Sequence, residues 1–586
     1  MHKHLRSFLE QLKQVNQLTV IDAPVDPKLE MAEIHRRVID EQGPALLFTN
    51  VIGKDFPVVT NLFGTVERVD MAFGPRPEQI VKDLVHGLDK LLPPKLSSLW
   101  ELRDPLMGVM KTGTRTVSSS QAPVLQVSNE EVDLTKLPAL TGWHLDGGPF
   151  VTLPLVYTEH PQTKEHNLGM YRIQIYDKNT TGMHWQIQKG GGFHYHEAEK
   201  NNQALPVTLT IGGPPALIVS AIAPLPEMVP ELIFASLLMG DKLNMVEVPD
   251  HAHKIVAEAE FVFGGIVPPH IRRPEGPFGD HFGYYSWEHD FPIFQVKHAW
   301  RRKDAIYPAT VVGKPRQEDY FIGDYLQRLL SPMFPVVMPG IKSLWTYAET
   351  GFHALAGAVV RESYYKEAMA HAFRIMGEGQ LTLTKFLMVT DVSCDLGNFK
   401  QFLPIILERF MPERDLLIVN DTSGDTLDYT GRKFNHGSKG IMLGIGEPVR
   451  ELPHEYHGPE LPMIGDIQTF CPGCLVISGA SFEEEPDLAD QLVPYVNEHA
   501  ADWPMIVLVD DAQIASKQSS FLWTVFTRFD PAHDLYAKST IVRNKIRYEG
   551  PLLIDARMKP FYPDEVTTHP EIDALVTKRW KEYFPS

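Results

Sequence analysis

The 586-residue chain has few cysteines, a deficit of positive charge and no long apolar run. Three cysteines are too few for disulfide bonds to hold a chain of this size together. The 55 Lys and Arg residues against 74 Asp and Glu residues give a net charge of −19, which argues against nucleic acid or an anionic membrane as the main partner. No uninterrupted apolar run approaches about 18 residues, and the N-terminus lacks the apolar core of a signal peptide. These absences predict a cytoplasmic protein without an integral membrane segment.

Two of the three cysteines form a C-x-x-C pair, Cys471 and Cys474. A zinc site of this type takes a second Cys pair, which the chain lacks, although His454 and His457 precede the first one. A redox role is a further alternative. We favour a turn in which the two thiols have no special function.

The chain length, and a residue pattern that changes along the chain, predict a multidomain protein of α/β and β type. Residues 1–115 combine apolar positions at helical spacing with short apolar runs, as in an α/β domain. Residues 116–330 contain short runs of β-branched and aromatic residues between turn residues, among them Val207–Ile211 and Ala216–Ile222, which favour a β-barrel or sandwich. From residue 331 onward strands and helices alternate, which indicates a parallel sheet.

A weak internal repeat divides the C-terminal part into residues 331–465 and 466–586. Asp391 recurs as Asp510 and Arg409 as Arg528, in both cases 119 positions later. We interpret the second segment as a repeat of the C-terminal α/β module, with coincident spacing as the alternative.

The most informative segment is Pro274–Asp280, which places the carboxylates of Glu275 and Asp280 five positions apart. Its two Gly and two Pro residues disfavour a helix, and such a segment can fold back so that both acids face one site. Arg172 offers a guanidinium to pair with them. Two acids in different environments beside a fixed cation would leave one ionised and one protonated at neutral pH. The pattern indicates proton-transfer chemistry, with ordinary turn-capping acids as the alternative.

Three further patterns are weaker signals. Lys189 followed by Gly190–Gly192 resembles a loop whose backbone amides hold a phosphate, without the spacing of a P-loop or a Rossmann fingerprint. His194 and His196 would face the same side of a strand and so suggest zinc, although a surface pair is the simpler interpretation in a chain with 24 His. Lys439, between a Ser and a Gly, is a candidate phosphate ligand.

Taken together, these segments resemble the UbiD family of reversible decarboxylases. The ordered matches run from residue 5 to about residue 450 and include Gly43–Phe48, Asn61–Thr65, Asn167–Arg172, Pro224–Glu227, Pro274–Tyr285, Asp304–Tyr307 and Gly437–Lys439. The resemblance implies an N-terminal α/β domain, a central flavin-reductase-like split β-barrel and a C-terminal α/β domain. The extension beyond about residue 465 is similar to that of longer homologues in menaquinone biosynthesis.

The resemblance also implies prenylated FMN as the cofactor, its phosphate anchored by a divalent metal ion, usually Mn²⁺, and by K⁺. The metal ligands fall on Asn167 and Glu231, while Gln188 stands where the family has His. We expect the Gln188 carbonyl to replace that His, with His184 or His194 as alternatives, or a more weakly bound ion. The residues implied in cofactor binding are Asn167, Met170, Tyr171, Arg172, Gln188, Lys189, Glu231 and Lys439.

The same resemblance implies catalytic roles for Arg172, Glu275 and Asp280. Arg172 and Glu275 are expected to form an ion pair, while Asp280, with a pKa raised by an apolar wall, protonates the product carbon after CO₂ leaves. The expected activity is non-oxidative (de)carboxylation of an aromatic or α,β-unsaturated carboxylic acid. A menaquinone precursor is the preferred substrate, and 4-hydroxy-3-polyprenylbenzoate of ubiquinone biosynthesis is the runner-up.

Two other classes of function stay open. One is a flavin-binding oxidoreductase, and the other is a catalytically silent paralogue that acts in binding or assembly, which the departure at Gln188 motivates. A flavin prenyltransferase would supply the cofactor to a decarboxylase of this family. We also expect a homo-oligomer, either a dimer or a hexamer.

Overall fold

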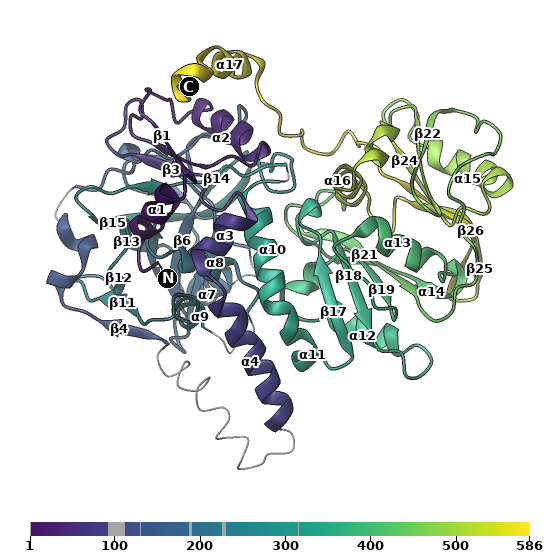
Figure 1. Cartoon of the computed structure of the whole chain (residues 1–586), viewed down its shortest axis with the longest axis horizontal. Helices are drawn as coiled ribbons and strands as arrows, with labels where there is room; N and C mark the ends of the chain where they lie inside the picture. The colour runs from purple at the N-terminus through teal and green to yellow at the C-terminus, as the bar shows by residue number, and fades with distance from the viewer. Residues whose placement is uncertain are drawn as a thin grey trace. The chain divides into compact units, whose positions relative to one another are not determined.

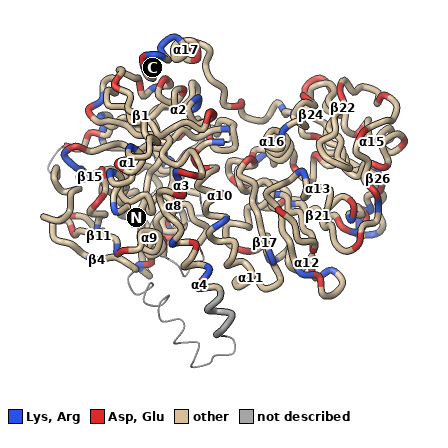
Figure 2. Tube along the Cα trace, in the orientation of Figure 1, with Lys and Arg blue, Asp and Glu red and all other residues tan. Residues whose placement is uncertain are grey.

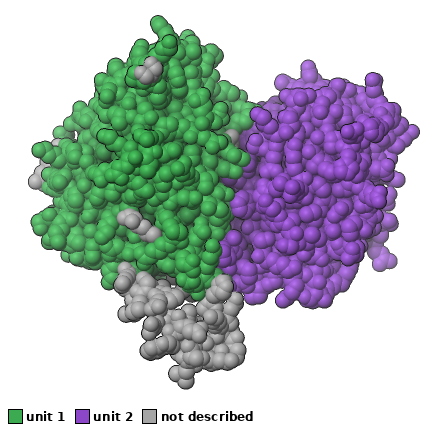
Figure 3. Space-filling view, in the orientation of Figure 1, with its two compact units in different colours: residues 1–329, 564–586 green, residues 330–563 purple. Residues whose placement is uncertain are grey.

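The computed structural model describes residues 2–91, 112–128, 131–186, 190–225, 230–314 and 316–585. The chain divides into two compact units, unit 1 with residues 1–329 and 564–586 and unit 2 with residues 330–563 (Figure 3). Acidic and basic residues are distributed over both units (Figure 2). Within the described ranges, none of the helices has the length and apolar character needed to cross a membrane. By this division, the chain passes from unit 1 into unit 2 after Leu329 and returns to unit 1 at Asp564.

The N-terminal part of unit 1 is a small α/β layer, coloured purple in Figure 1. Leu5, Phe8, Leu9 and Leu12 are buried on one face of the first helix, which confirms the helical spacing. The Thr65 side chain accepts a hydrogen bond from the Arg68 amide and so caps α3. The elements are α1 (Leu5–Gln14), β1 (Leu18–Ile21), α2 (Glu30–Asp40), β2 (Ala45–Phe48), β3 (Val58–Thr60), α3 (Val66–Phe73) and α4 (Arg76–Leu91), and the sheet order is β1-β2-β3-β16, with β16 at Tyr307–Pro308.

A seven-stranded sheet forms the centre of unit 1. Its path is β14 (Arg272–Glu275), β15 (His289–Arg301), β13 (Phe261–Val267), β10 (Leu205–Ile211), β6 (Pro154–Glu159) and β7 (His166–Gly169), with β9 (Thr180–Gly182) also paired to β15. Smaller sheets join β12 (Ile255–Val256), β11 (Leu243–Val246) and β4 (Thr114–Thr116), and β5 (Phe150–Val151) with β8 (Ile173–Gln174). Among the described strands the path does not close into a ring, so the split barrel remains a prediction.

Two local predictions in this region are wrong. The segment expected as a strand over Ala216–Ile222 is the helix α8 (Pro215–Ile222), because a short, wholly apolar run has no period that separates a buried helix from a buried strand. His194 and His196 lie on the helix α7 (Gly190–Lys200), where one is buried and the other exposed, so they do not share a face. The helix α9 (Glu231–Met239) follows in the same region.

Unit 2 contains two five-stranded sheets of the same design. The first has the order β17-β18-β19-β21-β20 and the second β22-β23-β24-β26-β25, and in both the outer pairs are antiparallel and the inner pairs parallel. The strands are β17 (Ile341–Thr346), β18 (Leu355–Val360), β19 (Phe386–Thr390), β20 (Leu416–Ser423), β21 (His436–Gly444), β22 (Ile464–Cys471), β23 (Cys474–Gly479), β24 (Met505–Val509), β25 (Leu535–Val542) and β26 (Lys545–Asp555).

Helices cover these sheets and carry the chain between the units. They are α10 (Glu318–Leu330), α11 (Phe334–Val337), α12 (Glu367–Met376), α13 (Phe399–Leu407), α14 (Pro412–Asp415), α15 (Leu488–His499) and α16 (Gln518–Arg528). The last helix of the chain, α17 (Pro570–Tyr583), packs on α2 within unit 1.

Individual contacts follow the 119-residue offset found in the sequence. The Met411 amide donates to the Asp415 carboxylate at 3.0 Å, and the Asp530 amide donates to the Asp534 carboxylate at 2.7 Å. The copies differ where residues 424–435 join β20 to β21, since only residues 543 and 544 join β25 to β26. The four domain boundaries and a common origin of the two sheets remain predictions, and residues 564–586 of the last predicted domain cluster with unit 1.

The C-x-x-C pair lies at the tight turn between β22 and β23. Gly473 in that turn has φ of +80°, a conformation that favours glycine. Both thiols are buried and free, and burial raises the pKa of Cys474 well above its usual value. The described residues contain no group of three or more His, Cys, Asp or Glu side chains placed to hold a metal ion. The pair therefore lies at a turn, as expected, and the interpretation that its thiols have no special function stays a prediction.

The buried ion pair of Arg557 and Asp555 is expected to stabilise the second sheet. The guanidinium donates to the two carboxylate oxygens at 3.0 and 2.7 Å, and both side chains are fully buried. Asp555→Ala leaves an uncompensated buried charge and should lower the free energy of unfolding by about 3–5 kcal/mol. Denaturant titration measures this loss. The control Asp502→Ala, at an exposed position, should change stability by less than about 0.5 kcal/mol, and equal values for the two variants would contradict the assignment.

Candidate active site

One guanidinium in unit 1 binds both acids of the Pro274–Asp280 segment. Arg172 Nε donates to Glu275 Oε1 at 2.9 Å, and Arg172 Nη2 donates to Glu275 Oε2 at 3.0 Å. Arg172 Nη1 donates to Asp280 Oδ2, and Nη2 also donates to Ser286 Oγ at 2.9 Å. The three charged side chains are at most 10% exposed. The expectation that Arg172 pairs with the two acids is confirmed.

The backbone of the acid-bearing segment explains how both carboxylates reach Arg172. Glu275 ends β14, and Gly276 then adopts φ of +101°, which favours glycine. Residues 278–286 fold into a short hairpin in which the Asp280 amide donates to the Tyr284 carbonyl at 3.0 Å and the Ser286 amide to the Phe278 carbonyl at 2.8 Å. The first acid therefore comes from a sheet strand and the second from a turn.

A neighbouring loop braces this segment through backbone amides. Gln174 Oε1 accepts from the Gly276 amide at 2.9 Å. Asp146 Oδ1 accepts from the Gly279 amide at 2.8 Å, while Asp146 Oδ2 accepts from the amides of Gly142 and Trp143 at 2.8 and 2.9 Å. A Cβ atom on Gly279 would lie 2.1 Å from the Trp143 ring, so only glycine fits there. The sequence reasoning missed Asp146 and Gln174, since neither belongs to a recognisable motif.

Both acids are held ionised in the free protein. Burial raises the pKa of Glu275, but the charge of Arg172 and hydrogen bonds from His184 and Arg172 outweigh it and lower that pKa to about 2. Burial likewise raises the pKa of Asp280, and the Arg172 charge with bonds from His281 outweighs it and places the pKa below its usual value. The prediction of one ionised and one protonated acid is therefore wrong for this state, because one guanidinium serves both carboxylates.

Two histidines extend the cluster. His184 Nδ1 lies 3.0 Å from Glu275 Oε2, in a buried position. His281 Nδ1 lies 2.8 Å from Asp280 Oδ1, and its side chain is 26% exposed. His281 therefore connects Asp280 to solvent, whereas His184 contacts Glu275 on its buried side.

Two of the three expected metal ligands lie next to each other. Asn167 is on β7, and the Leu168 amide that follows it donates to Glu231 Oε2 at 3.2 Å, at the first residue of α9. Burial raises the pKa of Glu231. An amide oxygen and a carboxylate suit a hard divalent cation such as Mn²⁺ or Mg²⁺. The third expected ligand, Gln188, and its neighbour Lys189 lie outside the described residues.

The surroundings of Asn167 fit a polar cofactor. His184 Nε2 and Trp185 Nε1 are buried and have no hydrogen-bond partner among the described residues. The Gly191 amide and Asn167 Nδ2 both donate to the Tyr171 hydroxyl, at 3.1 and 3.2 Å. These unpaired ring nitrogens and the nearby oxygen ligands are polar groups that a phosphate-bearing cofactor with its cation would satisfy. Of the alternative ligands, His184 already contacts Glu275, and His194 Nδ1 lies 2.9 Å from Thr158 Oγ1.

Lys439, the candidate phosphate ligand, belongs to unit 2. It lies on β21, where its ammonium donates to the carbonyls of Thr382 and Thr384 at 2.6 and 2.8 Å. Burial lowers the pKa of Lys439 to about 8. Its role at a cofactor stays a prediction.

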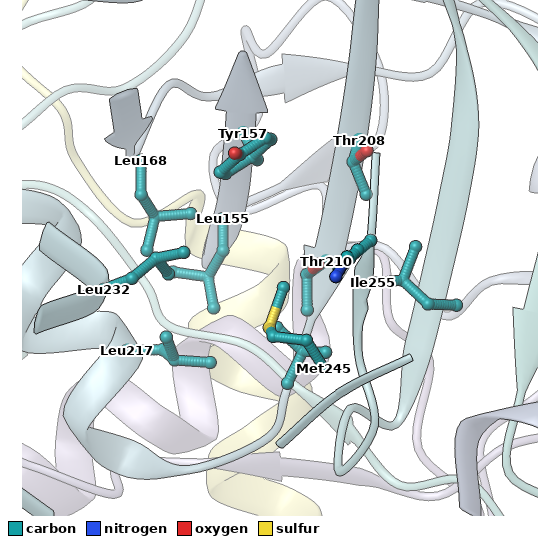
Figure 4. Close-up of a pocket in the computed structure, with 11 residues that line it drawn as sticks. Leu155, Tyr157, Leu168, Thr208, Thr210, Leu217, Leu232, Met245 and Ile255 are labelled. Carbon is teal, nitrogen blue, oxygen red and sulfur yellow. The ribbon is translucent and has the colours of Figure 1, made fainter. Parts of the chain in front are cut away.

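A small cavity is lined in part by Leu168 and Leu232, the residues that follow the candidate metal ligands in the sequence (Figure 4). It measures about 10 Å³ and is lined mainly by apolar side chains, including Leu155, Leu168, Leu232 and Met245. A volume of this size holds about one water molecule, so it is not a flavin or substrate site. Leu168 and Leu232 directly follow Asn167 and Glu231, which makes the cavity part of the packing that supports those two residues.

Three domain models of one family match most of the chain. They are the N-terminal domain of 3-octaprenyl-4-hydroxybenzoate carboxy-lyase over residues 9–88, the Rift-related domain over residues 115–315 and the C-terminal domain over residues 320–444. The chain belongs to the UbiD family. Members of this family are carboxy-lyases, so the expected family and enzyme class are confirmed.

Relatives of full length support this membership. A Chlamydia pneumoniae protein, named as one of the subunits of a 4-hydroxybenzoate decarboxylase, is 50% identical over 586 residues, covering 99% of this chain and 98% of its own. An uncharacterized protein of Chlamydia trachomatis is 51% identical over 587 residues, 99% of this chain and 100% of its own. An Archaeoglobus fulgidus protein is 35% identical over 465 residues, 78% of this chain and 95% of its own. The chlamydial proteins therefore share the C-terminal extension.

Two solved structures show the fold. The vanillic acid decarboxylase of Sedimentibacter hydroxybenzoicus, in closed form, superposes with a TM-score of 0.68 at 23% identity, covering 79% of this chain and 96% of that chain. The UbiD-class enzyme HmfF of Pelotomaculum thermopropionicum, in complex with FMN, gives a TM-score of 0.62 at 23% identity, with 78% and 97% coverage. The UbiD family thus shares a multidomain α/β fold with this chain.

Asp146 gives a testable pH dependence. Burial raises its pKa from 3.8 to about 6, so the folded protein binds this proton more tightly than the unfolded chain does. The contribution of Asp146 to stability therefore falls as pH rises from about 4 to about 6. Asp146→Asn removes the titration. The unfolding free energy of the wild type minus that of the variant should therefore decrease as pH rises over that range. A pH-independent difference would contradict the assignment, and Asp502→Asn, at an exposed position, is the control.

Proposed function

We propose that this protein is a non-oxidative decarboxylase of aromatic acids that uses prenylated FMN. The observation that carries the proposal is the buried Arg172 guanidinium that binds Glu275 and Asp280 together. Membership of a carboxy-lyase family supports it, and so do the family structures described in complex with FMN and with prenylated FMN. The named relative from Chlamydia pneumoniae points to the same substrate class.

The residues around Asn167 would hold this cofactor. Asn167 and Glu231, with Gln188, would bind a divalent ion at its phosphate, and Met170, Tyr171, Arg172, Lys189 and Lys439 complete the proposed binding set, with Mn²⁺ and K⁺ as the proposed ions. When bound, prenylated FMN supplies an electron sink for the bond that breaks at the carboxyl carbon, which no protein side chain provides. The unpaired ring nitrogens of His184 and Trp185 support a polar group at this place.

Arg172 is the proposed recognition group for the substrate carboxylate. In the free protein one positive charge balances two carboxylates, so a third carboxylate competes directly for the guanidinium. Glu275 holds Arg172 by two bonds and Asp280 by one, so the competitor displaces Asp280. A planar, permanently charged side chain suits this exchange, because Arg can bind carboxylates in more than one bidentate arrangement.

Asp280 becomes a proton donor when it loses its contact with the Arg172 guanidinium. Without its cation, burial and the nearby negative charges raise the Asp280 pKa, and the carboxylate takes up a proton. His281 contacts Asp280 Oδ1 and is partly exposed, so it can pass that proton from solvent. After CO₂ leaves, protonated Asp280 donates to the product carbon. The raised pKa expected from the sequence thus belongs to the substrate complex in this proposal.

The proposal also covers the substrate, the source of the cofactor and the assembly of the protein. A menaquinone precursor is the preferred substrate, 4-hydroxy-3-polyprenylbenzoate is the runner-up, and a flavin prenyltransferase supplies the cofactor. The central sheet of unit 1 acts as the split barrel, and the second sheet of unit 2 as a repeat of the first. We also propose that the protein works in the cytoplasm as a homo-oligomer.

Asp280→Asn tests the proton-donor role. The amide keeps the shape of the side chain but cannot donate an acidic proton, so CO₂ release should fall by about 10²- to 10⁴-fold. The measurement is CO₂ release from a panel of hydroxyaryl acids, with protein co-expressed with a flavin prenyltransferase. Asp290→Asn, at an exposed carboxylate on β15, should match the wild type.

Each outcome of this assay has a distinct meaning. Wild-type turnover by Asp280→Asn would remove Asp280 from the mechanism. NAD(P)H oxidation without CO₂ release by the wild type would favour the oxidoreductase alternative. No activity with a fully loaded flavin would favour the silent paralogue.

Glu231→Ala tests the proposed metal site without an activity assay. Removing one of the oxygen ligands should weaken divalent-ion binding by about 10-fold or more, and Mn²⁺ content after dialysis should fall, because ligand charge count sets affinity for hard cations. Glu288→Ala, at an exposed carboxylate, is the matched control. Equal Mn²⁺ retention by both variants and the wild type would refute the site.

A further inference from the structure

The C-terminal segment 564–566 extends the hairpin that carries Asp280. The Tyr285 amide donates to the Asp564 carbonyl at 2.9 Å, and the Val566 amide donates to the Gly283 carbonyl at 3.0 Å. Tyr284 and Glu565 pair as an antiparallel bridge, and Gly279 and Tyr285 pair on the other side of the same strand. The segment is therefore the third strand of a small ladder whose first strand leads into Asp280.

Side-chain packing follows the same ladder. Val566 is 5% exposed and forms a buried cluster with Tyr285 and Trp143. Trp143 is the residue whose ring leaves no space for a Cβ atom at Gly279, immediately before Asp280. Contact thus runs without interruption from Val566 through Trp143 to the acid-bearing turn.

The last helix fixes this strand to α2. The Thr568 hydroxyl donates to Glu33 Oε2 at 2.9 Å, and Arg37 Nη2 donates to Asp573 Oδ1 at 2.7 Å. Arg579 donates to Glu30, to which the Tyr583 hydroxyl also donates at 2.5 Å. In Figure 1, α17 lies against α2, although the two helices come from opposite ends of the chain. The tail is anchored on both sides of residues 564–566, by the ladder and by the helix.

We propose that residues 564–566 are a positioning element for Asp280. Their pairing with residues 283–285 holds the hairpin in the register that brings the Asp280 carboxylate to Arg172 and His281. The role of Asp280 rests on the proposed function, but its placement is a property of the free protein. A chain that ended before residue 564 would keep Arg172, Glu275 and Asp280 and lose the strand that orders the turn.

The ladder segment follows unit 2 directly in the chain. Unit 2 runs from Leu330 to Pro563, and Asp564 is the first residue of the ladder. The ladder is therefore the first part of unit 1 that the chain forms after unit 2.

Val566→Pro is the direct test. Proline lacks the amide that donates to Gly283 and keeps an apolar side chain. We expect the amides of Asp280 and Ser286 to exchange with deuterium at least about 10-fold faster, and CO₂ release to fall at least about 10-fold with FMN binding unchanged. Thr567→Pro, at the next and exposed residue, is the matched control and should leave exchange at 280–286 unchanged. Val566→Ala, which keeps the amide, should have an intermediate effect.

The outcomes separate this inference from the proposed function. Unchanged exchange at Asp280 and Ser286 in folded Val566→Pro would overturn the inference, whatever the activity. Accelerated exchange in a protein that releases no CO₂ would support positioning while the decarboxylase proposal fails. If Val566→Pro does not fold, the double variant Thr568→Val with Arg579→Gln loosens the anchor and leaves the ladder residues intact. It should accelerate exchange at 280–286 as well, and no acceleration there would equally overturn the inference.

Discussion

The ion pair network of Arg172 is the constraint on which the rest of the site depends. Two carboxylates and one guanidinium are buried together, and burial of charge is costly unless every charge has a close, well-directed partner. Arg172 meets this demand with four donor contacts to Glu275, Asp280 and Ser286. A lysine would offer a single point charge and could lose its proton on burial, whereas arginine stays charged and spans both acids.

A turn that bears a buried acid needs support from elsewhere in the fold. Here the support comes from three separate places: Gln174 beside Arg172, Asp146 in the loop before β5, and the ladder strand 564–566. Each contributes hydrogen bonds to backbone amides or carbonyls of the acid-bearing segment, so each fixes the main chain and leaves the carboxylates free to exchange partners. The network combines a braced backbone with a guanidinium that two carboxylates share.

The parts of this account that the sequence predicts are those with local signals. Helical spacing predicted α1, and the β-branched run Val207–Ile211 predicted β10. The Gly and Pro content of Pro274–Asp280 indicated a turn that could bring two acids to one guanidinium, as the structure shows.

The sequence failed where the signal is not local. Ala216–Ile222 is apolar throughout and has no period, and His194 and His196 depended on a strand that is a helix. The charge state of Asp280 depended on a partner shared with Glu275, and the ladder joins segments from distant parts of the chain, so neither has a sequence pattern.

The central claim is that Arg172 keeps Asp280 ionised until a substrate carboxylate takes its place. An infrared titration of the free protein, with Asp280→Asn as the subtracted reference, measures the Asp280 carboxyl directly. The account predicts a protonation midpoint below the ordinary Asp value of about 4 in the free protein, and a midpoint displaced upward when a benzoate-type ligand is bound. A midpoint above about 6 in the free protein, or one that no aryl carboxylate moves, would contradict it.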